Sequence, residues 1–441
     1  MRNEMTIFIC LSLVTFGPVD LKAKEIKTPL FLTLSQALEM AQQQNIQVIV
    51  ARERITQALA GLSEGRSVLF PQLTGSVSEH RQTRDLRSTG ISLPGDPLVG
   101  PFNSFDARLK ITQTIFDLSA VNRLKAARDN HQLSIAEFNK AKQDTLVLVA
   151  SLFIDAKRAK QNQRLAQIIL KRDKKRLEKV LTQKHSGTGT DVEVKEATAD
   201  YQRSLSQWRL AQSETNKSLL DLKAALGLAD ADEVVLGGYG NFLTISLTLP
   251  KNLEENIEHQ PDVRVAFHQY QTQKSQQQAE ISGYLPTIAV AGDYGPSGVT
   301  PDNSNNTYTL GVSASIPIWE GGLRQAKVKE AASQTKESEA EFQDTRRQTI
   351  SKIKSAQETW QASLASIKEK NAQLAASSQA FRLAQQRFES GLGSDVERIE
   401  ALAQQQSADD QLREAVATFL MAKFQLARAL GQMDELLKQT E

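Results

Sequence analysis

Apolar side chains recur every seven residues through the last third of the chain, and small residues lie between them. A strict seven-residue period is the pattern of a left-handed coiled coil, in which apolar side chains of one helix fit between those of a partner. The series therefore predicts a long packed helix, and we assign its side chains to packing. It consists of Ile353, Trp360, Ile367, Leu374, Phe381 and Phe388. A similar stripe predicts a first, shorter helix and consists of Leu38, Ala41, Val48, Ile55, Leu59 and Leu62.

Proline is absent between Pro101 and Pro250 and again after Pro317. Both tracts are rich in good helix formers and are interrupted mainly by glycine. Each tract therefore predicts a hairpin of two helices, and at 1.5 Å per residue the first helix of each hairpin would be about 100 Å long. The predicted helices run over 119–184 and 191–226 in the first hairpin, and over 323–388 and 395–430 in the second.

Between the helices the period changes to two. In "SFDARLKITQTIF" (104–116), Phe105, Ala107, Leu109 and Ile111 alternate with polar residues, as in a strand whose faces meet different surroundings. "NTYTLGVSASIPIW" (306–319) repeats the pattern, and 70–80 and 285–295 are weaker versions. We expect four strands of about ten residues in two pairs, joined by loops over 81–104 and 295–305. The polar face of the last strand carries Thr309, Gly311, Ser313 and Ser315.

A strand of about ten residues has the length needed to cross a membrane at a tilt, and aromatic residues mark the strand ends, as at a membrane interface. Four strands cannot close a barrel, so a membrane location requires several copies of the chain. The edge of a soluble sandwich is the alternative for these strands. The aromatic residues are Phe70, Phe102, Phe116, Tyr284, Tyr294, Tyr308 and Trp319.

The chain contains the same arrangement twice. "HSGTGTDVEVKEA" (185–197) is matched by "ESGLGSDVERIEA" (389–401), and "LTLSQALE" (32–39) by "LTLPKNLE" (247–254). We therefore predict two tandem repeats, each with a helix, a strand pair and a helical hairpin. The first repeat spans 24–235, with strands about 70–116 and a hairpin over 119–227. The second spans 236–441, with strands about 285–319 and a hairpin over 323–431.

Composition limits the possible functions. Lys and Arg number 53 against 51 Asp and Glu, so no basic surface for nucleic acid is expected. Residues 1–23 read as a signal peptide that contains the only cysteine, Cys10. Ile9 precedes that cysteine where lipidation needs a small residue, so we do not expect a lipid anchor. No later stretch is apolar enough for a membrane helix.

The paired "SGxG[TS]DVE…A" turns, the strand starts "FPQL" and "LPTI" and the junctions "IFD" and "IWEGG" resemble the outer membrane efflux protein family, the TolC-like outer membrane channels. The resemblance covers essentially the whole mature chain. It implies a homotrimer in which each protomer gives four strands to a shared twelve-stranded transmembrane β-barrel. It also implies that the long coiled-coil helices form an α-barrel, which continues the channel as a tunnel into the periplasm.

The two glycine-containing turns have a structural explanation of their own. Glycines allow the chain to reverse at positive φ, the following Thr/Ser and Asp are good helix N-caps, and glutamates favour the first turn. The stretch lacks the GK[ST] of a phosphate-binding loop. The residues of the two tips are Gly187, Thr188, Gly189, Thr190 and Asp191, and Gly391, Leu392, Gly393, Ser394 and Asp395.

In the family, such tips close the periplasmic end of the tunnel and contact an adaptor protein. The resemblance implies gate carboxylates at Glu193, Glu397 and Glu400, which in three copies would form an acidic ring. The family's gate arginine and tyrosine are replaced here by Gly393 and Phe388. The inter-helix lock made by those two residues is therefore in doubt for this chain.

The sequence favours a passive exit duct that takes part in efflux or type I secretion. The five histidines are scattered without a catalytic or metal-binding motif, so no enzyme activity and no cofactor are expected. The resemblance implies an adaptor and an inner-membrane RND or ABC transporter as partners. A soluble periplasmic coiled-coil scaffold or chaperone is the alternative, and the sequence does not distinguish among drugs, metals and proteins as cargo.

Overall fold

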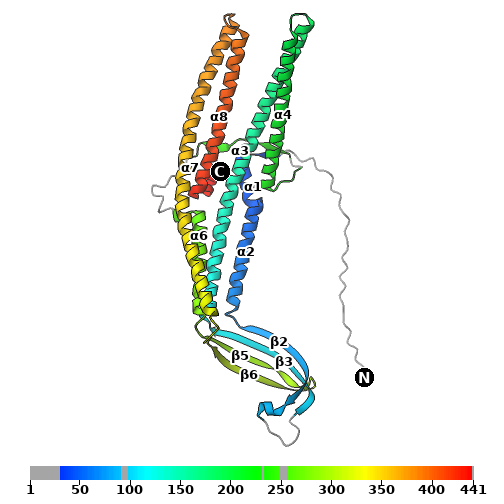
Figure 1. Cartoon of the computed structure of the whole chain (residues 1–441), viewed down its shortest axis with the longest axis vertical. Helices are drawn as coiled ribbons and strands as arrows, with labels where there is room; N and C mark the ends of the chain where they lie inside the picture. Colours follow the sequence, from blue (N-terminus) through cyan, green and yellow to red (C-terminus); the bar gives the residue numbers. More distant parts are fainter. Residues whose placement is uncertain (1–29, 91–97, 231–232, 246, 248–256, 440–441) are drawn as a thin grey trace, which may run out of the picture.

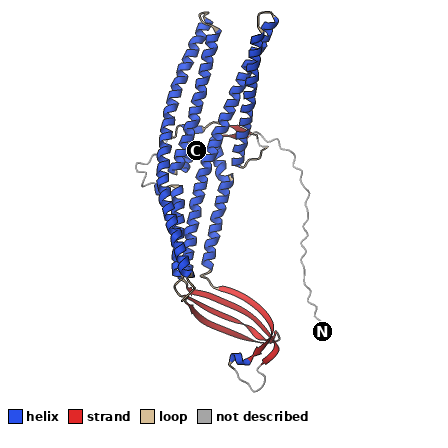
Figure 2. Cartoon of the chain, in the orientation of Figure 1, coloured by secondary structure: helices blue, strands red, loops and turns tan. Residues whose placement is uncertain are grey.

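The computed structural model describes residues 30–90, 98–230, 233–245, 247 and 257–439. The predicted signal peptide, Cys10 and most of "LTLPKNLE" lie outside these residues. Figure 1 shows an elongated molecule in which long helices stand on one end of a small sheet. Figure 2 shows that helix and strand occupy separate ends of the molecule, apart from a short strand beside the helices and a short helical turn at the far end of the sheet.

The long helices lie within one or two residues of their predicted bounds. In each hairpin the shorter helix packs along the half of the longer helix that is nearer the tip, and the second hairpin reproduces the first. The first hairpin consists of α3 (Leu118–His185) and α4 (Asp191–Leu226), and the second of α7 (Leu323–Glu389) and α8 (Asp395–Leu430). Shorter helices complete this part: α1 (Leu34–Gln44), α2 (Ile46–Ser67), α6 (Pro261–Ser282) and α9 (Met433–Lys438).

The predicted first short helix is two helices, and the prediction of one was wrong. Asn45 is extended between them, with φ −65° and ψ 132°. Its side chain accepts a hydrogen bond from Gln47 N at 2.9 Å and donates one to Ala225 O at 2.7 Å. Asparagine competes with the helix for backbone hydrogen bonds, and here it caps α2 while it ties α1 to the end of α4. The apolar stripe did not reveal the break because Leu38, Ala41 and Val48 are buried on both sides of it.

The four predicted strands form one antiparallel sheet in the order β2-β3-β5-β6. The expectation of ten-residue strands with long loops was wrong. Strand pairing continues beyond the segments in which apolar and polar residues alternate, and β5 and β6 are paired as far as Thr300 and Asn303. The strands are β2 (Gln72–Asp85), β3 (Leu98–Phe116), β5 (Thr287–Thr300) and β6 (Asn303–Ser315). A second, parallel pair joins β1 (Leu30–Leu32) to β4 (Val234–Leu236). Short 3-10 turns span Leu86–Thr89, Gly240–Leu243 and Ile257–His259.

The main hydrophobic core lies at mid-height of the helices. Side chains of α1, α3, α8 and α9 meet there with those of the segment that connects the two repeats. Phe242 of this segment and Phe424 of α8 are both buried, with ring centroids 5.3 Å apart. Toward the tips, packing relies on small residues such as Ser363 and Ala384, which are buried between α7 and its neighbours. A small core of this kind agrees with the low aromatic content.

Two lysines that pair with no carboxylate among the described residues hold the connecting segment against the helices. Lys157 Nζ of α3 donates to Gly237 O at 2.7 Å, and lies 4.1 Å from the centre of the Tyr239 ring. Lys423 Nζ of α8 donates to Phe242 O at 2.5 Å and to Ile245 O, and this side chain is buried. Burial lowers the pKa of Lys157, and it lowers that of Lys423 to about 8. Both amines therefore use backbone carbonyls to fix a segment that has little regular structure.

A network of ion pairs joins α3, α6 and α8 just below this core. Arg428 Nε lies 2.5 Å from Asp144 Oδ1, and its Nη1 lies 2.9 Å from Asp262 Oδ2. Lys140 Nζ approaches the other oxygen of Asp262 at 2.9 Å. Burial tends to raise the pKa of Asp262, but hydrogen bonds and charge from Arg428 and Lys140 outweigh it and hold that pKa below its ordinary value. The network connects helices of both repeats.

Candidate functional site

The tips of the two hairpins lie at the end of the molecule farthest from the sheet (Figure 1). In the first tip, Thr188 N and Gly189 N both donate to Gln183 O, at 2.9 and 3.0 Å. In the second, Leu392 N and Gly393 N donate in the same way to Arg387 O, at 2.8 and 2.9 Å. The repeated sequence thus folds into the same turn twice. In each turn, two backbone amide groups beyond the helix donate hydrogen bonds to a carbonyl group near the end of the helix, which would otherwise lack a partner.

The two glycines of each tip have different roles. Gly187 and Gly391 have φ of 77° and 75°, in the left-handed region. Gly189 and Gly393 do not, so the expectation of positive φ at all four glycines was wrong for this pair. A Cβ on Gly189 would lie 2.9 Å from Lys184 N, and one on Gly393 3.1 Å from the Cβ of Arg387. The second glycine is therefore required by close approach of the chain to the preceding helix.

Replacing both Gly187 and Gly391 by Ala should destabilise the hairpins by about 1–2 kcal/mol at each site, because L-residues are strained at positive φ. Gly61→Ala is the matched control. Gly61 lies inside α2, where an added methyl group would meet open space, so this change should instead stabilise by about 1 kcal/mol. Thermal unfolding followed by circular dichroism measures both effects, and a tip variant as stable as the wild type would contradict the assignment.

The three predicted gate carboxylates have different environments. Thr190 N and the Thr190 hydroxyl both donate to Glu193 Oε2, at 2.7 and 2.9 Å, in a capping box that lowers the pKa of Glu193. Arg387 Nη1 lies 3.0 Å from Glu397 Oε1, across the second turn. Glu400 is exposed and has no ion pair among the residues that the structure describes. Within one chain, the first two carboxylates thus contact residues of their own hairpins.

Sequence reasoning missed a contact beside the second tip. The Arg398 guanidinium lies over the Phe388 ring, 5.2 Å from its centre. Phe388 occupies the position where the resemblance expected a tyrosine, and the cation–π contact uses its ring without needing a hydroxyl. The sequence "DVERIEA" contains this arginine, but residue spacing alone does not predict which aromatic ring its guanidinium contacts. At the apex, Leu392 is 76% exposed and places an apolar side chain on the surface of the tip.

The sheet has one apolar and one polar face, as its alternation predicted. Directly opposed pairs on the apolar face include Leu73 with Ile111 and Tyr294 with Tyr308. These side chains are largely exposed in the single chain, and Val312 and Tyr308 reach 74% and 79%. The predicted interface residues Phe116 and Trp319 are also exposed; Phe116 ends β3 just before α3 (Leu118–His185), and Trp319 lies between β6 and α7. A large exposed apolar face marks an interaction with a membrane or another protein.

The polar face carries a group of charges that sequence reasoning did not single out. We call Asp106, Arg108, Lys110 and Asp293 the charged belt. Arg108 Nε lies 2.8 Å from Asp106 Oδ1, and its Nη1 lies 2.6 Å from Asp293 Oδ1. Asp106 and Arg108 are both on β3, whereas Asp293 is on β5, so the Arg108–Asp293 ion pair crosses the junction between the two repeats. Sequence alternation placed the β3 charges on one face, but the partner on β5 required the register.

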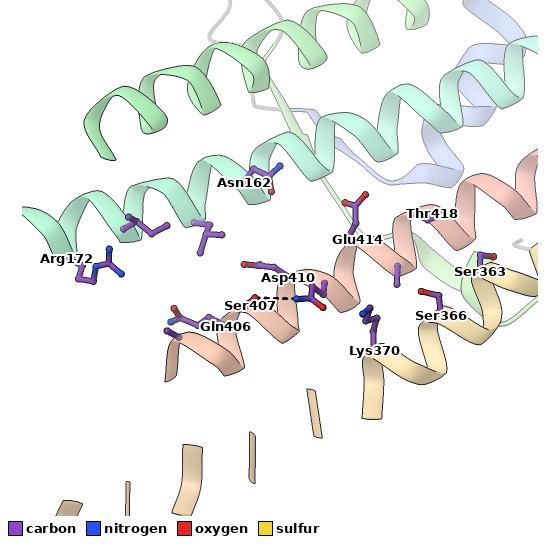
Figure 3. Close-up of a pocket in the computed structure, with 15 residues that line it drawn as sticks. Asn162, Arg172, Ser363, Ser366, Lys370, Gln406, Ser407, Asp410, Glu414 and Thr418 are labelled. Atoms are coloured by element: carbon purple, nitrogen blue, oxygen red, sulfur yellow. Dashed lines mark hydrogen bonds between the residues drawn. The ribbon is translucent and has the colours of Figure 1, made fainter. Parts of the chain in front are cut away.

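The helical part contains a groove of about 660 Å³ between α3, α7 and α8. Figure 3 shows Asn162 and Arg172 of α3 facing Ser407, Asp410 and Glu414 of α8, with Lys370 of α7 beside them. Burial raises the pKa of Asp410. The described residues include no group of three potential metal-binding side chains, and none of the described helices is long and apolar enough to cross a membrane. The groove is open and has a mixed lining, and the residues that line it do not form an arrangement of acid, base and nucleophile.

A helical hairpin and a strand pair, repeated in tandem with the four strands in one amphipathic sheet, is the architecture of bacterial outer membrane channels of known structure. The Campylobacter jejuni CmeC outer membrane channel has the same fold, with a TM-score of 0.75 and 16% identity over 92% of this chain and 88% of that one. The outer-membrane channel OprN gives 0.73, with 16% identity over 90% of each chain.

The sequence profile of the outer membrane efflux protein family matches residues 37–228 and 252–432, and the chain belongs to this family. Its relatives include the alkaline protease secretion protein AprF of Pseudomonas aeruginosa, 22% identical over 84% of this chain and 78% of that protein. The outer membrane protein TolC of Escherichia coli is 20% identical over 92% and 84%. The family match confirms the resemblance noted from the sequence. The family is one of outer membrane channels, which are transporters rather than enzymes.

Proposed function

We propose that three copies of this chain form the outer membrane exit duct of a tripartite efflux pump or a type I secretion system. The observation that carries the proposal is the sheet. Its apolar face is exposed, the outer edges of β2 and β6 pair with no other strand of the described residues, and it connects directly to the long hairpins. Joining β2 of one copy to β6 of the next satisfies both edges. Closure of three four-stranded sheets gives a twelve-stranded barrel with its apolar face in the lipid and its polar face around the channel.

The aromatic residues support a membrane position for the sheet. Tyr284 and Tyr294, like Tyr308 and Trp319, stand about ten residues apart, which is the length of a strand that crosses a membrane at a tilt. Tyr294 and Tyr308 are directly opposed in the register, so they lie at the same level. Trp319 and Tyr284 lie beyond the opposite ends of their strands, near the helices. The two levels bracket the apolar face as interfacial girdles do.

The hairpin tips are then the periplasmic entrance and the contact with an adaptor, which links the duct to an inner-membrane RND or ABC transporter. Three copies of Glu397 and Glu400 would form the acidic ring, with Arg387 partly neutralising Glu397. Glu193 lies in the other tip and is held by its capping box. The names of the relatives allow either cargo class, since PrtF of Dickeya chrysanthemi is a proteases secretion protein and OpmQ of Pseudomonas putida is a pyoverdine export protein.

Glu397→Gln combined with Glu400→Gln should weaken block of the channel by multivalent cations added on the hairpin side. A ring of carboxylates attracts such ions, and neutralising six charges in three copies removes most of that attraction. Single-channel recording in planar bilayers measures the blocking concentration, with an expected increase of about tenfold. Glu330→Gln with Glu337→Gln is the matched control, because both residues are exposed on α7 near the sheet. Equal block in the tip variant and the wild type would remove the acidic ring.

A cysteine at Thr188 tests the duct itself. The sequence has only one other cysteine, within the predicted signal peptide, so crosslinking in cells should report the new position alone. The expected product is recovered from the outer membrane as a trimer crosslinked to an adaptor, which mass spectrometry identifies. A chain recovered only from the soluble periplasm would contradict the duct and favour the coiled-coil scaffold.

A further inference from the structure

Charge is distributed unevenly between the two hairpins. Residues 157–185 of α3, which lead to the first tip, contain eleven Lys and Arg against two Asp and Glu. Residues 361–389 of α7, the matching stretch of the second repeat, contain four against two. Both stretches form the same helix and end in the same turn. The excess of positive charge on α3 is therefore not a requirement of the fold.

Five of the basic residues of α3 recur at intervals that keep them on one face of a helix, over a length of about 22 Å. We call them the basic stripe: Lys160, Arg164, Lys171, Lys174 and Lys175. All five side chains are exposed, and none forms an ion pair or hydrogen bond with any residue that the structure describes. The matching positions of α7 keep only one of the five charges; they are Leu364, Lys368, Ala375, Ser378 and Gln379.

Neighbouring carboxylates do not cancel the charge of the stripe. Residues 155–179 of α3 and the facing stretch 409–414 of α8 together contain eleven Lys and Arg against six Asp and Glu. The adjacent stretch of α4, 196–217, adds three basic and three acidic residues and leaves this difference unchanged. Its Asp200 is bound by Arg176, which is not on the stripe, at 2.9 Å. The surface around the stripe therefore stays positive.

The stripe begins on the side of α3 that carries the segment connecting the two repeats. Lys160 and Arg164 line one groove together with Leu236 of that segment. Asn162 and Arg172 line the groove on the other side, with α7 and α8 (Figure 3). A tunnel stays open only if an irregular segment is kept off its inner wall. In the proposed duct, the segment and the stripe therefore lie on the outer wall, toward the periplasm.

The stripe offers charge but little apolar surface. Of residues 160–175, all of which the structure describes, only Ile168 exposes a large apolar side chain. A docked helix needs a row of apolar anchors, and lysine is depleted in protein interfaces, whereas a hydrated polyanion binds by charge alone. Lipid phosphates are too distant. Lys160 follows the start of α3 by 42 residues, or about 63 Å, and charges are screened over about 8 Å.

We propose that the basic stripe binds the cell-wall peptidoglycan, a polymer of sugars whose peptide stems carry carboxylates, where the duct passes through it. The proposal rests on the duct proposed above, because the outer wall meets the periplasm only in that assembly. One exposed ion pair contributes at most about 1 kcal/mol, but three linked copies of the stripe act together. Binding should fade as salt is raised, because the screening length falls from about 10 Å at 0.1 M to about 3 Å at 1 M.

Co-sedimentation of the purified protein in detergent with insoluble peptidoglycan, stripped of its bound proteins, tests the stripe. Lys171→Gln, Lys174→Gln and Lys175→Gln together should lower the apparent affinity about tenfold at about 0.1 M salt. Arginine at the same three positions should retain the wild-type affinity, because it keeps the charge. Glutamine is a good helix former, so circular dichroism should show an intact helix in the variant.

The matched control removes the same charge from the other repeat. Lys327→Gln, Lys329→Gln and Lys336→Gln change three exposed lysines of α7 near the sheet, and this variant should bind like the wild type. Peptidoglycan whose carboxylates have been amidated should not bind the wild type.

The outcomes separate the stripe from the duct. Wild-type protein that does not sediment with peptidoglycan, binding that survives amidation, or an equal loss in the control variant overturns the stripe and leaves the duct standing. A photoreactive residue in place of the exposed Gln167 should be recovered from cells linked to peptidoglycan fragments, and capture of a protein instead would overturn the proposal. Failure of the duct itself is detected independently, by crosslinking from the cysteine at Thr188.

Discussion

Arg428→Met lowers the free energy of unfolding by about 3–5 kcal/mol, the range found when one partner of a buried ion pair is removed. The Arg428 side chain is only 15% exposed and binds both Asp144 and Asp262. Methionine has a similar length but leaves Asp262 partly buried, with Lys140 as its remaining partner. The loss should be visible as a shift of the guanidinium unfolding midpoint in detergent.

Arg158→Met is the control for this experiment. Arg158 binds Glu414 through Nε and Nη2, but the two side chains are 39% and 53% exposed, so the loss should be at most about 1 kcal/mol. The pH dependence gives a second measurement. Because the pKa of Asp262 is lowered in the folded state, its stabilisation is complete above about pH 4 and is lost as the pH falls through the folded value. Equal losses in both variants, or an unchanged acid transition in Arg428→Met, would contradict the network.

The wild-type protein should become more stable by about 2 kcal/mol between pH 7.5 and 10, relative to Lys423→Met. An unfolded lysine keeps its proton to about pH 10.5, whereas Lys423 in the fold loses it above about 8. The unfolded state therefore binds more protons in this window, and stability rises with pH. Methionine does not titrate, so the variant lacks the rise.

Melting temperatures measured between pH 7.5 and 10 test this prediction. The upper limit avoids Tyr239, whose pKa is raised to about 12 by burial and which therefore favours unfolding above pH 10. Lys217→Met, a change at an exposed lysine, should follow the wild type. Parallel curves for wild type and Lys423→Met would show that the buried amine keeps its ordinary pKa.

Periodicity predicted the helices because long coiled coils repeat one local rule over many turns. The bounds of α4 and α8 follow from local signals, namely the Thr190 and Ser394 caps and the glycines at 227 and 431. The helix break at Asn45 could not be predicted in this way, because the Asn45 side chain is held by a hydrogen bond to Ala225, far away in the sequence. Strand length was underestimated for a related reason. Hydrogen bonding continues into polar segments where alternation of apolar residues has ended.

The candidate sites were likewise predictable where local sequence decides the structure, and not where contacts between distant segments decide it. Glycine spacing predicted both tips, including the capping residues, but not the Arg387–Glu397 pair or the stacking of Arg398 on Phe388. Those contacts depend on how one helix returns beside the other. The charged belt required the register of β3 against β5, which joins the two repeats and has no signal within either strand. Lys423 likewise has carbonyl partners whose positions come from an irregular segment.

The free edges of the sheet belong to different strands, β2 and β6. Any joint between copies is consequently head to tail, with non-identical surfaces meeting at each of three contacts in the proposed ring. A substitution confined to one edge then alters all three contacts in a ring made only of altered chains. It alters only one contact when a single altered chain is combined with two intact ones. A cysteine placed on one edge cannot contact the same cysteine of a neighbouring copy. Genetic dominance and covalent locking of the ring thus both depend on which edge is changed.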